Sequence, residues 1–382
     1  MKRLIAPILV LLAGPALFFN GLSAQIMPVP APPSLSAPSY ILLDYASGST
    51  LVEHNPDEPR EPASLVKLMT GYVVFSELKS GHLQLEDEVT VSEKAWRMGG
   101  SRMFIEVGRT VVVEDLLRGL IVQSGNDASV ALAEHVAGNE ETFAQLMNQY
   151  AERLGMHNTT FANATGWPDP NQITTARDIA TLARAMIRDF PEYYSYYSER
   201  SFTFNDITQQ NRNMLLFRDD TVDGLKTGHT SSAGYNLVSS ALREEMRLVA
   251  AVMGTDGPGS RADQSQALFN YGFRFFRSYR LYEQGEALVS PRLWKGSSET
   301  IPLGLAESMH ITIPQRQYDN LDASLRVDSP LVAPVRRGQK LGEVVVRLEG
   351  QIVAEAPLIA LEDGEEAGFF GRLLDEFMLL FQ

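Results

Sequence analysis

The sequence predicts an α/β region, followed by a small all-β domain and a terminal amphipathic helix. Within residues 25–285, strand-like runs near both ends enclose several long helical patterns. From residue 286 to residue 362 the helical patterns give way to short β-rich runs separated by proline and glycine. Residues 363–382 again show helical spacing. A chain of 382 residues is long enough for these separate domains.

The N-terminus has the layout of a secretory signal peptide. Met1-Lys2-Arg3 supplies two cations, an apolar stretch runs from Leu4 to Phe19, and the small residues Ser23-Ala24 follow. The stretch is too short and too broken by proline and glycine for a comfortable membrane span. We expect residues 1–24 to be removed on export, with an uncleaved anchor helix as the alternative interpretation.

The α/β region opens with an extended leader rich in proline, alanine and serine at residues 25–38. Strands are predicted at 39–44, 50–54, 222–226, 234–242 and 246–253. Helices are predicted at 64–77, 113–137, 142–154, 175–189 and 262–277. Strands at both ends and helices between them predict one α/β domain over residues 25–285.

The all-β domain is predicted from five short runs at regular spacing. They lie at residues 300–303, 310–313, 321–327, 342–349 and 351–359. Turn residues separate the runs, a pattern typical of a small sandwich. This domain is expected to span residues 286–362.

The C-terminal segment, residues 363–382, predicts an amphipathic helix. Its apolar residues recur at helical spacing: Phe370, Leu373, Leu374, Phe377, Met378 and Phe381. Such a helix can lie in the plane of a membrane surface, although it is too short to span one. The alternative is a helix docked on its own protein. The aromatic content and the terminal position favour the membrane surface.

Composition excludes several functional classes. With 33 Lys and Arg against 47 Asp and Glu, the net charge of −14 argues against nucleic acid as a partner. No cysteine is present, so disulfides, thiol nucleophiles and cysteine-based metal sites are excluded. The six histidines are scattered and form no His-Glu-x-x-His pattern, so no metal or cofactor is expected.

A first candidate catalytic pair is Ser64 and Lys67, in Ser64-Leu65-Val66-Lys67. Residues three apart on a helix are neighbours, which brings the hydroxyl and the amine together. The lysine can take the proton of the serine only if its pKa is lowered by burial or by a second cation. The spacing alone also fits a capping serine and a surface lysine.

Two further motifs complete the pattern. In Ser124-Gly125-Asn126, the Ser124 hydroxyl could relay a proton and the Asn126 amide could hold a substrate carbonyl, although these residue types also form ordinary turns. In Lys226-Thr227-Gly228, Lys226 would be the second cation and Thr227 could bind a carboxylate. Gly228 would let a substrate backbone approach closely.

These three motifs, in this order, are known from β-lactamases and penicillin-binding proteins. The sequence resembles the serine-type D-Ala-D-Ala carboxypeptidases, the low-molecular-mass penicillin-binding proteins of the S11 peptidase type. The resemblance extends over nearly the whole mature chain, including Gly100–Ile105, Thr174–Asp178 and Ala233–Tyr235. It implies a transpeptidase/β-lactamase-like fold, with a five-stranded antiparallel sheet surrounded by helices, and a membrane-anchoring terminal helix.

The resemblance also implies the role of each site residue. Ser64 would attack the bond between the last two D-alanines of a peptidoglycan stem pentapeptide, and Lys67 would take the proton. The oxyanion would lie on the backbone N–H groups of Ser64 and His229. The remaining implied site residues assist proton transfer or bind substrate: Ser124, Asn126, Lys226, Thr227, Gly228 and Arg261. β-Lactam antibiotics would acylate the same serine, on the periplasmic side of the inner membrane.

Three other functions stay open from the sequence. A β-lactamase would share the motif order, but no Glu-x-x-Leu-Asn segment follows Ser124. A D,D-endopeptidase of the same superfamily would also share it. A non-catalytic peptidoglycan-binding scaffold would have no use for Ser64, Lys67 and Lys226.

Overall fold

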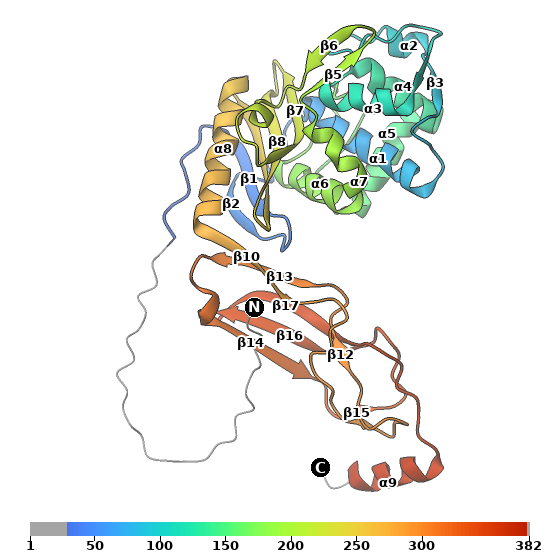
Figure 1. The fold of residues 1–382 in the computed structure, drawn as a ribbon, viewed down its shortest axis with the longest axis vertical. Coiled ribbons are helices and arrows are strands. Elements are labelled where there is room, and N and C mark those ends of the chain that lie inside the picture. The colour runs from blue at the N-terminus through green and yellow to red at the C-terminus, as the bar shows by residue number, and fades with distance from the viewer. Residues whose placement is uncertain (1–28, 380–382) are drawn as a thin grey trace. The chain divides into compact units, whose positions relative to one another are not determined.

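The computed structural model describes residues 29–379, and the predicted signal peptide lies outside the described residues (Figure 1). A five-stranded antiparallel sheet, in the order β2-β1-β9-β8-β7, forms the centre of the α/β region. Its strands are β1 (Ser39–Asp44), β2 (Thr50–His54), β7 (Val222–Thr230), β8 (Gly234–Arg243) and β9 (Met246–Thr255). The sheet therefore joins the two ends of the region, as the resemblance implies.

Both faces of this sheet are covered, which explains why β1 is buried at every residue. Successive side chains of a strand point to opposite faces. Ile41 and Leu43 belong to the large core, together with α6 (Ala176–Asp189). Leu42 points instead to α8 (Pro258–Phe275), where its side chain lies against Gly272. The sheet is thus held rigidly between α6 and α8 (Figure 1).

The remaining helices of the α/β region pack into one cluster around α1. They are α1 (Val66–Ser80), α2 (Glu93–Trp96), α3 (Val113–Val122), α4 (Asn126–Ala137), α5 (Glu140–Arg153) and α7 (Pro191–Tyr194), with the 3-10 turns η1 (Ala63–Leu65) and η2 (Ser195–Ser198). A further 3-10 turn, η3 (Met214–Phe217), packs instead against α8 and β7. Two small antiparallel strand pairs complete the region: β3 (Glu88–Thr90) with β4 (Thr110–Val112), and β5 (Ser201–Phe204) with β6 (Ile207–Gln210), of which the second is a hairpin. Because α1 is buried on nearly every side, its N-terminus is firmly placed.

One predicted helix is wrong in its extent. The pattern over residues 113–137 forms two helices, α3 and α4, because the chain breaks between them. Ser124 adopts a left-handed conformation with φ of +58°, which a helix cannot contain, and Gly125 is the N-cap of α4. The break is the turn predicted from the polar residues Ser124-Gly125-Asn126.

The all-β domain is confirmed. Its strands are β10 (Phe276–Tyr282), β11 (Leu293–Trp294), β12 (Leu303–Gly304), β13 (Met309–Pro314), β14 (Leu321–Val327), β15 (Leu331–Val332), β16 (Lys340–Leu348) and β17 (Gln351–Ala360), with the turn η4 (Tyr318–Asn320). A four-stranded sheet, in the order β12-β17-β16-β14, and the pairs β10-β13 and β11-β15 enclose a second apolar core. The first residues of β10 had been predicted as the end of the preceding helix.

A terminal helix, α9 (Phe369–Leu379), follows this domain, as predicted. Among residues 29–379, no helix is long and apolar enough to cross a membrane. The apolar side chains of α9 are exposed, including Phe369, Phe370, Leu373 and Leu374.

Candidate active site

Ser64 and Lys67 lie where the buried helix α1 begins. Ser64 is in the turn η1 and Lys67 is in the first turn of α1. The Lys67 Nζ atom lies 3.2 Å from Ser64 Oγ, so the structure brings together the two groups that their spacing predicts to be neighbours. Ala63, just before them, has a φ of +49°, a left-handed conformation that a non-glycine residue adopts at a cost in energy. Such backbone strain is concentrated at functional sites.

The Lys67 amine is fully buried and held by two oxygens. Its Nζ donates to Asn126 Oδ1 at 2.7 Å and to the Thr165 carbonyl oxygen. Burial lowers the pKa of Lys67 to about 7, and the positive charge of Arg212 contributes to the lowering. The sequence predicts Lys226 as the second cation, and the charges of Lys67 and Lys226 do interact, since that of Lys67 lowers the pKa of Lys226. Arg212 is a further cation that lowers the pKa of Lys67. A pKa near 7 leaves much of the amine neutral at neutral pH.

The turn between α3 and α4 meets β7 at a second lysine. Lys226 Nζ donates to Ser124 Oγ at 2.9 Å and to the Thr227 carbonyl oxygen at 3.1 Å. Burial lowers the pKa of Lys226 well below its usual value, and the positive charges of Lys67, Arg212 and Arg261 lower it further. Lys226 is therefore connected to the cavity by its hydrogen bond to Ser124, which lines it.

The amide of Asn126 is held at both ends. Its Oδ1 accepts from Lys67, and its Nδ2 donates to the Gly99 carbonyl oxygen at 2.8 Å. These two bonds fix the orientation of the amide, with its oxygen facing Lys67. The amide nitrogen has a second hydrogen, which is left to donate a hydrogen bond to a substrate carbonyl.

A buried carboxylate shapes the loop opposite β7. Asp127 accepts hydrogen bonds from the backbone N–H groups of Met103, Phe104 and Ile105, at 3.0, 2.8 and 3.3 Å. The loop that contains Ser101 is therefore fixed to the N-terminus of α4. This arrangement explains the Gly100–Ile105 and Val122–Asp127 motifs as one structural unit, with Ser101 on the rim of the site.

Strand β7 forms the opposite wall and carries Thr227, Gly228 and His229. The sequence predicts that Gly228 admits a substrate backbone, but the close neighbour is the chain itself. A Cβ atom at Gly228 would lie 2.9 Å from the Pro62 carbonyl oxygen and 3.2 Å from the Leu65 nitrogen. Glycine is thus needed so that β7 can pack against the turn that holds Ser64.

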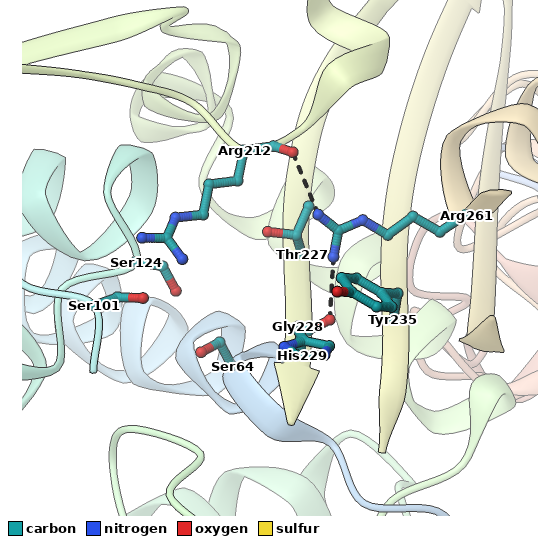
Figure 2. Close-up of a pocket in the computed structure, with 9 residues that line it drawn as sticks. All are labelled: Ser64, Ser101, Ser124, Arg212, Thr227, Gly228, His229, Tyr235 and Arg261. Atoms are coloured by element: carbon teal, nitrogen blue, oxygen red, sulfur yellow. Dashed lines mark hydrogen bonds between the residues drawn. The ribbon is translucent and has the colours of Figure 1, made fainter. Parts of the chain in front are cut away.

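Two arginines bring positive charge to the site from opposite sides (Figure 2). Arg261 reaches in from α8; its Nη1 donates to the carbonyl oxygens of Gly228 and Asn236, and its Nη2 to that of Arg212. Burial lowers the pKa of Arg261 to about 10, so its guanidinium stays charged at neutral pH. The guanidinium of Arg212 points across the cavity toward Ser124.

Arg212 was missed in the sequence, although a signal for it exists. It follows the hairpin β5–β6, whose Asn205-Asp206 turn has both residues at positive φ, a typical two-residue hairpin turn. The flanking asparagines are buried and anchored: Asn211 Nδ2 donates to the Glu199 carbonyl and Asn213 Nδ2 to that of Gly224. The hairpin and these anchors place the guanidinium over the site.

Together these groups line a cavity of about 240 Å³ (Figure 2). Its lining residues are Ser64, Ser101, Ser124, Arg212, Thr227, Gly228, His229, Tyr235 and Arg261. A hydroxyl beside a buried amine of lowered pKa suits acyl transfer, and the arginines suit a substrate with a carboxylate. Among residues 29–379, no group of three or more potential His, Asp or Glu ligands is placed to hold a metal ion.

Comparison with known proteins identifies the family. The family described as D-alanyl-D-alanine carboxypeptidase matches residues 27–257, and the C-terminal domain of penicillin-binding protein 5 matches residues 276–366. The chain belongs to the D-alanyl-D-alanine carboxypeptidases. It is a serine-type enzyme of the penicillin-binding protein 5 group, and the predicted fold class is confirmed.

Individual relatives cover nearly the whole chain. The chain is 46% identical over 357 residues to the D-alanyl-D-alanine carboxypeptidase DacC of Escherichia coli, covering 91% of this chain and 89% of that protein. It is 42% identical over 361 residues to DacA of the same organism, covering 92% and 90%. Penicillin-binding protein 5 from Haemophilus influenzae superposes with a TM-score of 0.85 at 44% identity, covering 88% and 99%.

Proposed function

We propose that Ser64 is the nucleophile with which this carboxypeptidase removes the terminal D-alanine of a peptidoglycan stem pentapeptide. The observation that carries the proposal is the contact between Ser64 Oγ and the buried Lys67 amine, whose pKa is lowered to about 7. A serine hydroxyl needs a neighbouring base to become nucleophilic, and a neutral lysine amine is such a base.

The hydrogen bonds of Lys67 support its role as that base. A neutral amine has two N–H groups and one lone pair. Asn126 Oδ1 and the Thr165 carbonyl oxygen accept hydrogen bonds from Nζ, and each can receive one of the two N–H groups. The lone pair is then directed to Ser64, the third neighbour of Nζ. Lys67 takes the hydroxyl proton as the Oγ–acyl bond forms.

The substrate is held at its carboxylate and at its reacting carbonyl. Thr227 and the guanidinium of Arg261 bind the terminal carboxylate at the end of the cavity beside Tyr235. The backbone N–H groups of Ser64 and His229 stabilise the oxyanion. Loss of one such donor typically raises the barrier by about 2.7–4 kcal/mol.

The leaving D-alanine needs a proton on its amine when the D-Ala–D-Ala amide bond breaks. Ser124 and Lys226 are placed to deliver it, because Lys226 Nζ donates to Ser124 Oγ and Ser124 lines the cavity. Water then attacks the acyl-enzyme, which releases the shortened peptide and restores Ser64.

β-Lactam antibiotics are proposed to acylate the same serine. A related chain, penicillin-binding protein D2 from Listeria monocytogenes in its ampicillin-bound form, is 29% identical with a TM-score of 0.58, covering 63% of this chain. Slow release of the acyl group would distinguish this carboxypeptidase from a β-lactamase.

The terminal helix is proposed to hold the exported enzyme on the periplasmic surface of the inner membrane. The polar side of α9 is tied to the β domain, since Asp375 pairs with Arg292 at 2.9 Å and Glu376 pairs with Lys295. The opposite side exposes Phe370 and Leu373, by 84% and 59%. An apolar stripe of this kind suits the lipid interface.

Mass spectrometry of the products from a synthetic stem pentapeptide tests the proposed reaction. Release of free D-alanine and a tetrapeptide is the expected result. Cleavage at another bond, or no cleavage, would contradict it. Labelled penicillin separates the alternatives: stable labelling is expected, rapid turnover would indicate a β-lactamase, and no labelling would indicate a scaffold.

A further inference from the structure

A second cavity, of about 300 Å³, lies next to the active-site cavity. Its lining residues are Arg60, His229, Ser231, Ser232, Ala233, Gly234, Tyr235, Gly254, Thr255 and Asp256. The two cavities have two lining residues in common, His229 and Tyr235. These two side chains therefore form the partition between the cavities.

The partition is built as a cross-strand pair. His229 on β7 is the register partner of Tyr235 on β8, and the two rings stack with their centres 4.0 Å apart and their planes 28° apart. Cross-strand aromatic pairs of this kind stabilise both side chains. The stack stands at the end of the active-site cavity where the guanidinium of Arg261 lies (Figure 2).

Two further contacts fix Tyr235. Its carbonyl oxygen accepts a hydrogen bond from Thr255 Oγ1 at 3.0 Å, next to a register shift between β8 and β9. The guanidinium of Arg261 lies 5.5 Å from the centre of the Tyr235 ring, within the range of a cation–π contact. The ring is therefore held by β7 and α8, and its backbone is held by β9.

The second cavity has the chemistry to receive a peptide end. Arg60 supplies a cation, Ser231 a hydroxyl group and Asp256 a carboxylate, while the Ser232 hydroxyl already donates to Glu61 at 2.6 Å. Within the described residues, the buried Nε of Arg60 has no hydrogen-bond partner, while its Nη2 donates to Glu58 at 2.8 Å. Because Nε is buried, a ligand in the cavity could reach only the outer nitrogens of the guanidinium, and Nη2 is already paired with Glu58. Nη1 is therefore the donor that this side chain offers to a carboxylate.

We infer that the His229–Tyr235 stack determines the length of the leaving group: it limits the leaving group to one amino acid and closes off a cavity that could bind a second one. This inference rests on the proposed function, in which Arg261 and Thr227 bind the terminal carboxylate beside the stack. Tyr235 is thus a specificity-determining residue. With the ring removed, a substrate extended by one residue reaches the second cavity, and Arg60 binds its carboxylate. The chemistry is unchanged: the Ser64 acyl bond forms, the D-Ala–D-Ala amide breaks, and the leaving amine takes the proton.

The test compares two peptides with the full mature chain: diacetyl-L-Lys-D-Ala-D-Ala and the same peptide extended by glycine. The readout is the ratio of kcat/KM for release of D-Ala-Gly to that for release of D-Ala. We expect the wild type to prefer the shorter peptide by about a hundredfold or more, and Tyr235→Ala to raise the ratio by about tenfold or more. Tyr235→Phe, which keeps the stacked ring, leaves the ratio unchanged.

Controls separate this inference from the proposed function. Tyr235→Val, whose side chain suits a strand, replaces Tyr235→Ala if that variant is unstable. Covalent labelling by penicillin shows that the active site of each variant is intact, and absent D-Ala release by the wild type would contradict the proposed function instead. An unchanged ratio in both variants, with labelling retained, would overturn the inference. In the Tyr235→Ala background, Arg60→Gln is expected to remove most of the gain, and an undiminished gain would overturn the assignment of Arg60.

Discussion

The Nζ atom of Lys226 lies 2.9 Å from the hydroxyl oxygen of Ser124, although 102 residues separate the two in the chain. Both side chains are buried. The contact joins the helical cluster, through the turn between α3 and α4, to strand β7 of the sheet. The floor of the active site is therefore shared by the two halves of the α/β region, and neither half holds it alone.

Lys226→Met is expected to slow acylation by benzylpenicillin by about 100-fold or more, because the Ser124 hydroxyl loses its proton source. Stopped-flow or gel-based measurement of labelled penicillin gives the rate. Ser124→Ala should cause a similar loss. Because the two groups act as one relay, the double variant should lose little more than either single variant. If the loss of rate in the double variant equalled the product of the two single losses, the relay would be contradicted.

The acid limb of the pH–rate profile is expected near pH 7. Lys67 is a base only when neutral, and its pKa is lowered to about 7. The acylation rate should therefore fall about tenfold for each pH unit below that value and level off above it. A rate that is constant from pH 5 to pH 9 would contradict the role of Lys67.

Arg212→Gln is expected to move this limb to higher pH. Removing the positive charge makes protonation of Lys67 easier, so the pKa of Lys67 rises and a higher pH is needed to free the amine. Arg212→Lys keeps the charge and should leave the limb close to its wild-type position. A shift in the opposite direction would show that another group controls the profile.

Asp127→Ala is expected to lower the free energy of unfolding by about 2–4 kcal/mol, because three backbone N–H groups of residues 103–105 lose a charged acceptor. Urea denaturation measures the change. Asp127→Asn keeps a neutral acceptor and should lose less. Equal stability of the alanine variant and the wild type would contradict the structural role of this carboxylate.

Deletion of residues 366–382 is expected to move the protein from the membrane fraction to the soluble fraction while D-alanine release is kept. The lipid contact and the proposed chemistry lie in different domains. Phe370→Ser with Leu373→Ser leaves the helix in place and should weaken binding to lipid vesicles in the same direction. Unchanged sedimentation with vesicles would exclude α9 as the anchor.

Much of the fold follows from local sequence patterns. In β1 the continuous apolar run indicates burial on both faces, and in α6 the periodic apolar pattern indicates one buried face. Both elements are therefore predicted within a few residues of their observed bounds. Helices α3 and α4 were predicted as one because the apolar pattern continues on both sides of the turn at Ser124, whose left-handed φ ends α3. The order of the five strands depends on pairing between the two ends of the region, which a single sequence does not show.

The site residues that belong to sequence motifs could be predicted. Those that reach the site only through tertiary contacts could not. Ser64 and Lys67 lie three apart in the sequence, so helical geometry alone makes them neighbours. Arg212 belongs to none of the three motifs. The hydrogen bonds of Asn211 and Asn213 place its guanidinium near Ser124, and such tertiary contacts are not visible in the sequence. The packing of β7 on η1, which also requires glycine at position 228, is visible only in three dimensions.

Mapping the benzylpenicillin adduct by mass spectrometry tests the identity of the nucleophile most directly. The wild type should gain the mass of one penicilloyl group, located on Ser64, and Ser64→Ala should gain none while it remains folded. An adduct on a different residue, or an unchanged adduct in Ser64→Ala, would contradict the assignment of Ser64 as the acylated serine.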